Sequence, residues 1–81
     1  MKEDDNIEEQ EELFEHYHYV ADKGQEKLRI DKFLMDRIPN TSRNKIQLAA
    51  HNGNILVNKE KVKPNYKVKP MDDISIVLPY P

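Results

Sequence analysis

Two helix-ending residues, Pro39 and Gly53, restrict the middle of this chain to short helices. The stretch LRIDKFLMDRIP repeats apolar residues at helical spacing and stops at Pro39, because a proline disfavours helical backbone in the residue before it. A second helical pattern runs from Ser42, a favourable N-cap, to about Asn52, and it ends at Gly53, which suits the left-handed position after a helix. The sequence therefore predicts two short helices in close succession.

Strand patterns lie on both sides of these helices. FEHYHYVA, which begins at Phe14, alternates its side chains as a strand does. After the helices, NILVN and EKV predict a hairpin with a tight turn around Asn58 and Lys59. A loop, KPNYKVKPMDD, then leads to a last strand, ISIVLP, beginning at Ile74. We therefore expect an α+β fold in which two short helices pack on a small, mostly antiparallel sheet of three to five strands.

Charge divides the chain into two unlike parts. Residues 1–26 hold ten acids against two lysines, a net charge of -8, whereas residues 27–81 hold eleven lysines and arginines against five acids, a net charge of +6. Residues 1–12 have too few apolar side chains to offset their ordering entropy, so we expect a disordered acidic leader there and a folded domain over residues 13–81. No export signal or membrane span is visible, and we expect a cytoplasmic protein.

The start of the second helix points to an anion. Helix starts carry partial positive charge and favour acids, yet Arg43 and Lys45 follow Ser42 there. Backbone N–H groups, a hydroxyl and two cations together resemble a phosphate site, although ordinary solvent-exposed charges are the alternative. Replacing Arg43 by alanine is accordingly expected to leave stability unchanged or slightly raised. Other cations extend this corner into a stripe that suits a phosphodiester backbone; they are Arg29, Lys32, Lys59, Lys61, Lys63, Lys67 and Lys69.

Four motifs in order, LRIDKFL, SRNKIQ, GNILVN and KPMDDISIVLP, resemble a known RNA-binding domain. It is the domain shared by bacterial small-subunit ribosomal protein S-four, RNA pseudouridine synthases, tyrosyl-tRNA synthetases and a ribosome-associated heat-shock protein. The resemblance covers residues 27–78, and the chain looks most similar to the N-terminal segment of large-subunit ribosomal RNA pseudouridine synthases. It implies the S-four fold, with its alpha-L motif, and a structured RNA partner, expected to be ribosomal.

The resemblance also assigns roles to single residues. It implies RNA contacts by Arg29, Ser42, Arg43 and Asn58, while Asp31 is expected to brace the fold. Two turns depart from the family pattern, because lysine and methionine stand at positions 59 and 71, where glycine is frequent. Combined with the basic stripe, the candidate RNA-binding residues are Arg29, Lys32, Ser42, Arg43, Lys45, Asn58, Lys59 and Lys61.

No catalytic site is expected within the 81 residues. The resemblance implies a catalytic aspartate in an Arg-Leu-Asp context, which no aspartate of this chain has. Residues 79–81 look like the start of a linker to a missing catalytic domain. We expect no cofactor, no small-molecule ligand and no metal, because neither a cysteine nor a well-placed carboxylate accompanies His16 and His18.

Two interpretations of the whole chain remain. The favoured one is the monomeric RNA-binding module of a ribosomal RNA pseudouridine synthase, which positions structured RNA for uridine isomerisation by another domain. The alternative is a complete, stand-alone ribosome-associated RNA-binding protein with a structural or protective role.

Overall fold

The computed structural model describes residues 12–81. Its elements follow the order β1 (Phe14–Val20), β2 (Leu28–Arg29), α1 (Ile30–Met35), α2 (Arg43–His51), β3 (Ile55–Val57), β4 (Glu60–Lys61), β5 (Lys67–Val68) and β6 (Asp73–Leu78). The acidic leader expected over residues 1–12 lies outside the described residues, apart from Glu12.

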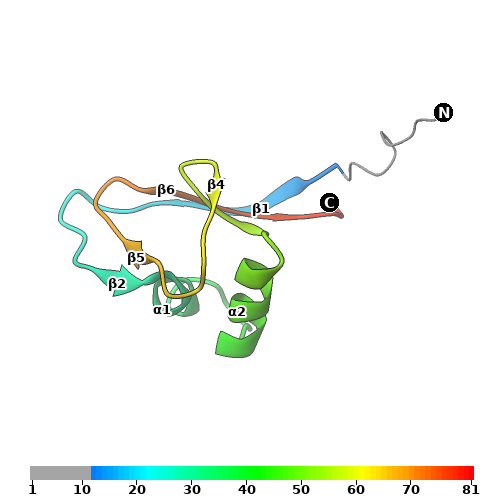
Figure 1. The fold of residues 1–81 in the computed structure, drawn as a ribbon, viewed down its shortest axis with the longest axis horizontal. Coiled ribbons are helices and arrows are strands. Elements are labelled where there is room, and N and C mark those ends of the chain that lie inside the picture. Colours follow the sequence, from blue (N-terminus) through cyan, green and yellow to red (C-terminus); the bar gives the residue numbers. More distant parts are fainter. Residues whose placement is uncertain (1–11) are drawn as a thin grey trace.

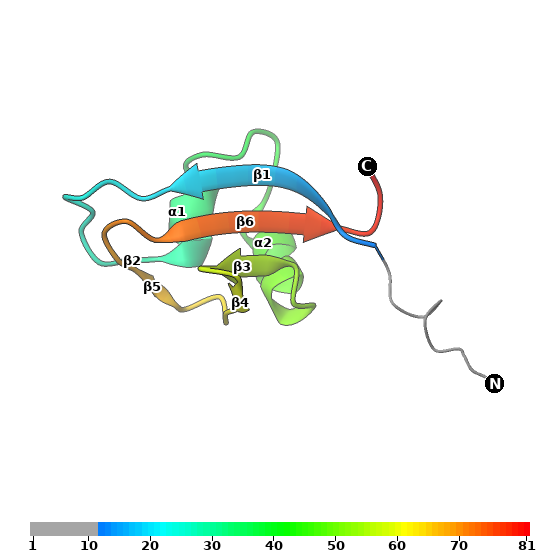
Figure 2. The same ribbon diagram turned by 90° about the horizontal axis from the view of Figure 1, so that it is seen from above.

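Four strands form one antiparallel sheet in the order β1-β6-β3-β4, and β2 pairs with β5 in a separate two-stranded sheet. Both helices lie on one face of the larger sheet (Figure 1). Its strands run side by side when the molecule is seen from above, with the helices behind them (Figure 2). The predicted α+β fold, with two short helices on a mostly antiparallel sheet of three to five strands, is confirmed.

The ends of α2 follow the local signals in the sequence. Ser42 is the N-cap, and its side-chain oxygen accepts a hydrogen bond of 3.2 Å from the backbone N–H of Lys45. At the other end, Gly53 has a φ of +76°, the left-handed conformation that glycine adopts at little cost. The N–H groups of Gly53 and Asn54 donate to the carbonyls of Ala50 and Ala49, which is the Schellman arrangement.

The first helix is shorter than its apolar pattern predicted. Leu28 and Arg29 belong to β2, and α1 runs only from Ile30 to Met35, so it ends before Pro39. The prediction of a loop over KPNYKVKPMDD was also wrong in part, because β5 lies within it and pairs with β2. A strand pair of two residues each is too short to show alternation, and its partners are far apart in the sequence.

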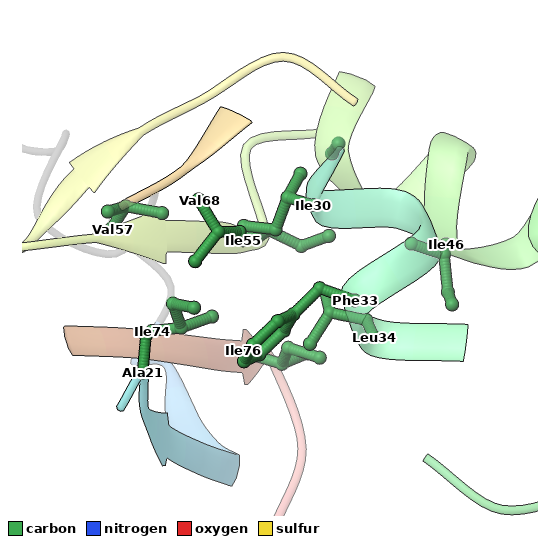
Figure 3. Close-up of a cluster of buried hydrophobic side chains, with 11 residues drawn as sticks. Ala21, Ile30, Phe33, Leu34, Ile46, Ile55, Val57, Val68, Ile74 and Ile76 are labelled. Carbon is green, nitrogen blue, oxygen red and sulfur yellow. The ribbon is translucent and has the colours of Figure 1, made fainter. Parts of the chain in front are cut away.

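The core lies between the helices and the larger sheet. Ile30, Phe33 and Leu34 of α1 are at most 1% exposed, and they face the buried strand residues Ile55 and Ile74 (Figure 3). The remaining buried hydrophobic members of this cluster are Ala21, Ile46, Ala50, Val57, Val68 and Ile76. One apolar cluster therefore holds α1 and α2 against the sheet and fixes the polar faces of both helices toward solvent.

Candidate nucleic-acid interface

Three of the predicted cations meet where α1 lies beside the start of α2. One hollow of about 420 Å³ brings them together; it is lined by Leu28, Arg29, Lys32, Met35, Asp36 and Arg43. Lys32 Nζ lies 3.6 Å from Asp36 Oδ1, but these side chains are 63% and 51% exposed, and such surface pairs contribute little to stability. Lys32 is therefore accessible to a ligand that carries a stronger negative charge.

A buried carboxylate holds the other two cations of this hollow. Arg29 donates from Nε and Nη2 to the two oxygens of Asp31, at 3.1 and 2.9 Å. Arg43 Nε lies 3.6 Å from Asp31 Oδ2. The backbone N–H of Lys32 and the side-chain amide of Gln47 also donate to Asp31, at 2.8 and 3.1 Å. Asp31 thus connects β2, α1 and α2 through one side chain.

The charge state of Asp31 follows from these donors. Asp31 is completely buried, and burial alone would raise the pKa of its carboxyl group. Hydrogen bonds from Arg29, Gln47 and the Lys32 backbone outweigh burial and lower the pKa of Asp31 below its ordinary value of 3.8. The carboxylate is therefore ionised at neutral pH, and it neutralises one of the two adjacent arginine charges.

The basic surface continues from Arg29 along α2. A second hollow is lined by Arg29, Gln47, His51, Lys63, Pro64 and Asn65. A third shares His51 and Lys63 with the second and is lined by Ala50, His51, Asn52, Gly53, Lys61, Val62 and Lys63. Because neighbouring hollows share residues, they form one continuous surface, whose cations we name the basic track: Arg29, Lys32, Arg43, Lys61 and Lys63.

Two residues of this surface were missed in the sequence. Gln47 and His51 line the second hollow but were not among the candidates. Their spacing from Arg43 was the available signal, since residues at i, i+4 and i+8 share one face of a helix. Lys63 was predicted only as part of the longer stripe, and the structure places it between Arg29 and Lys61.

Lys45 lies apart from the basic track. It lines a different hollow, formed by residues 38–41 together with side chains of α2, β1, β3 and β6 and with Tyr80. Two residues along a helix correspond to about 200° of rotation, so Arg43 and Lys45 point away from each other. The structure therefore separates the two cations that the sequence grouped at the start of α2. A role for Lys45 in RNA binding stays a prediction.

The β3–β4 turn has the backbone of a two-residue type I′ hairpin, because Asn58 and Lys59 have φ values of +52° and +71°. Asn58 uses its side chain within the protein. Its Nδ2 donates to Asp72 Oδ1, and its Oδ1 accepts from the N–H of Asp73, both at 3.1 Å. These bonds tie the hairpin turn to the turn before β6, which gives Asn58 a structural role; its predicted RNA contact stays a prediction.

Non-glycine residues retain the left-handed turn geometry. Lys59 has a φ of +71° and Met71 one of +69°, so both positions where glycine is frequent keep positive φ values. Each such residue costs about 1–2 kcal/mol relative to ordinary backbone. Lys59 is exposed at the tip of its turn, where its charge is accessible to a ligand.

Lys61 lies over the end of α2. A Cβ atom built on Gly53 would come within 3.0 Å of the Lys61 Cδ and Cε atoms, and within 3.3 Å of Nζ. The ammonium group is therefore near the C-terminal end of the helix, where the helix dipole favours a cation. A side chain larger than glycine at position 53 would require the end of the Lys61 side chain to shift slightly, and the positive φ of Gly53 would add backbone strain.

Other kinds of site find little support in residues 12–81. No group of three or more His, Asp or Glu side chains is placed there to hold a metal ion. The helices of this part of the chain are too short and too polar to cross a membrane. Four of the eight candidate residues lie on the basic track, namely Arg29, Lys32, Arg43 and Lys61.

The family model of the S4 domain matches residues 28–74. An uncharacterized RNA pseudouridine synthase of Chlorobaculum parvum is 43% identical over 56 residues, which are 69% of this chain and 17% of that protein. Another, from Bacillus subtilis, is 38% identical over 62 residues, which are 76% of this chain and 20% of that protein.

A third relative is ribosomal large subunit pseudouridine synthase C of Buchnera aphidicola, which is 40% identical over 48 residues, or 59% of this chain and 15% of that protein. The chain thus spans no more than a fifth of the length of these relatives. No solved structure matches it significantly. The family model covers more than half of the chain and contains the basic track, so the resemblance carried by the four motifs is confirmed and the chain belongs to the S4 domain family.

Proposed function

We propose that this chain is the RNA-binding module of a ribosomal RNA pseudouridine synthase and that uridine isomerisation belongs to a domain outside these 81 residues. The module holds structured RNA and thereby raises the concentration of substrate near that domain. It works in the cytoplasm as a monomer. The relatives favour this interpretation over a stand-alone ribosome-associated protein, because all three are named as pseudouridine synthases.

The basic track is the observation that carries this proposal. Its five cations come from β2, α1, α2, β4 and the segment after β4, and successive hollows connect them. A single small phosphate needs only one such hollow, whereas a row of hollows suits the repeated phosphates of a nucleic-acid backbone. Contacts of this type fix the position of the RNA and recognise its shape rather than its sequence.

The first prediction separates binding from catalysis. The purified chain is expected to bind folded large-subunit ribosomal RNA, with an affinity that falls as salt rises, and to leave uridine unchanged. A filter-binding titration measures the first property, and tritium release from RNA labelled at uridine C5 measures the second. Turnover by these 81 residues would contradict the assignment of catalysis to another domain. Failure to bind folded RNA at low salt would contradict the proposal itself.

The second prediction concerns the two cations at the start of α2. Arg43→Gln is expected to weaken binding similarly across RNAs of one shape and to reduce the slope of log affinity against log salt by about 0.7–0.9, because one phosphate contact is lost. Lys45→Gln is expected to change the slope less, since Lys45 lies on a different hollow. Lys23→Gln, in the exposed turn after β1, is the matched control. Equal slope changes for Arg43 and Lys45 would instead place a phosphate at the helix start between them.

A further inference from the structure

An acid in the middle of an RNA-binding surface requires an explanation. Asp31 has no exposed surface, yet its carboxylate is bonded to Arg29 and lies 3.6 Å from Arg43, two cations of the basic track. A neutral residue at this position would leave the track with one more unit of positive charge. If electrostatic attraction alone determined the affinity for RNA, a chain without the Asp31 charge would therefore bind RNA more tightly.

The contacts of Asp31 suggest what offsets this loss of attraction. Its two oxygens receive the Nε and Nη2 atoms of Arg29 side by side, which fixes the plane of the guanidinium group. Asp31 Oδ2 also faces Arg43 Nε from the neighbouring helix. An unrestrained arginine loses considerable rotamer entropy when it binds a phosphate, and a restrained one has already lost part of it.

Both arginines keep donors for a ligand. Only Nε and Nη2 of Arg29 bond to Asp31, so the two hydrogens of Nη1 remain available, and the Arg29 side chain is 41% exposed. Arg43 approaches Asp31 through Nε, and its side chain is 62% exposed. The buried carboxylate thus hydrogen-bonds one edge of the Arg29 guanidinium group and attracts that of Arg43 as an ion pair, while both side chains remain partly exposed.

We propose that Asp31 is a positioning residue for RNA binding, which presents Arg29 and Arg43 as one fixed pair of donors to the RNA phosphates. This inference rests on the proposed RNA-binding function. It assigns the RNA contacts to the two arginines and assigns to Asp31 only their orientation. Neutralising Asp31 then has two opposite effects on RNA affinity: the loss of positioning weakens binding, and the added positive charge strengthens it. The direction of the measured change therefore tests the inference.

Two variants provide the test, and each removes one negative charge: Asp31 lies within α1, and Asp36 caps its C-terminal end. Asp36→Asn removes an exposed acid beside Lys32 and is expected to tighten binding to folded large-subunit ribosomal RNA, because the surface becomes more positive. Asp31→Asn is nearly the same size as the wild-type residue and also removes one negative charge. It is expected to weaken binding about tenfold, because two charge-assisted contacts lose their orientation. Its salt slope is expected to fall despite the added positive charge.

A third variant covers the possibility that Asp31→Asn does not fold, which a melting curve would show. Arg29→Lys conserves charge and leaves Asp31 a cationic partner, but lysine lacks the planar fork. Charge alone predicts unchanged affinity for this variant, whereas positioning predicts a loss of several-fold. The variant is also expected to melt at a lower temperature, because it loses hydrogen bonds to a buried carboxylate, so its affinity is compared with that of the wild type at a temperature where melting curves show both to be folded.

The outcomes separate the two proposals. If the wild-type chain does not bind folded RNA, the proposed function fails. If the wild type binds and Asp31→Asn folds and tightens binding as Asp36→Asn does, Asp31 is not a positioning residue, while RNA binding stands. Where Asp31→Asn does not fold, unchanged affinity of Arg29→Lys overturns the positioning role in the same way. Weaker binding by folded Asp31→Asn, or by Arg29→Lys, supports it.

Discussion

Phe33→Ala is expected to leave much of the chain unfolded at room temperature. Phe33 is 1% exposed and lies between α1 and the sheet, where its ring makes an edge-to-face contact with Tyr19. The guanidinium carbon of Arg37 lies 3.6 Å from the centre of the same ring. Removing a buried phenylalanine costs about 3–5 kcal/mol, and the single core of a domain this small supplies only roughly that much net stability.

Urea unfolding followed by circular dichroism measures this effect. Leu48→Ala is the matched control, because Leu48 is 60% exposed on α2 and alanine is an excellent helix former. The control is expected to change the free energy of unfolding by less than about 0.5 kcal/mol. A Phe33→Ala midpoint as close to the wild type as that of Leu48→Ala would show that the stability of the domain does not depend on this cluster.

Elements with local signals were predicted well. The bounds of α2 depend on Ser42, whose side chain caps the helix, and on Gly53, whose positive φ ends it. Both effects act within a few residues of the chain, so the amino-acid pattern contains them. The same holds for the β3–β4 turn, where Asn58 favours the left-handed conformation.

Elements that depend on distant partners were not predicted. The N–H groups of Ile30 and Asp31 donate to the carbonyls of Tyr66 and Pro64, at 2.7 and 3.3 Å. These bonds satisfy the free N–H groups at the start of α1, which has no side-chain cap. They also bring β5 beside β2. A loop more than thirty residues away thus decides where α1 begins, and no local pattern shows it.

The candidate site was likewise predicted from the sequence only in part. Charge patterning identified the cations of the track, but their pairing with Asp31 required the packing of α1 against α2. The negative charge missing from the first turn of α2 is supplied by Asp31, whose carboxylate lies near Arg43 from the other helix. We therefore no longer expect Arg43→Ala to be neutral or stabilising. A loss of up to about 1 kcal/mol is expected, since Arg43 is largely exposed.

A second buried carboxylate makes the fold sensitive to acid. Asp72 is 6% exposed and accepts hydrogen bonds from Tyr66 Oη at 2.6 Å, the Lys69 N–H at 2.9 Å and Asn58 Nδ2 at 3.1 Å. Burial alone would raise the pKa of Asp72, but these donors lower it below 3.8. Burial and the bond to Asp72 also raise the pKa of Tyr66 to about 12.

The direction of the pH effect follows from the lowered pKa values of Asp31 and Asp72. In the unfolded chain these groups take up protons near 3.8, whereas in the folded chain they resist protonation to lower pH. Their contribution to stability is therefore complete above the unfolded pKa and is lost as pH falls through the folded pKa values. Their titration is therefore expected to lower the melting temperature in acid, steeply below about pH 4.

Asp72→Asn tests this origin of the acid sensitivity. At neutral pH it is expected to destabilise the domain by about 1–3 kcal/mol, because an amide has one acceptor oxygen for three donors and brings donors of its own. Below pH 4 its melting temperature is expected to fall less steeply than that of the wild type, since one of the two buried carboxylates no longer titrates. Asp22→Asn, at an exposed turn, is the control and is expected to keep the wild-type profile. If Asp72→Asn loses stability in acid as steeply as the wild type, the titration of Asp72 does not control acid unfolding, and the slope must come from Asp31 or from the repulsion among the many cations of the domain.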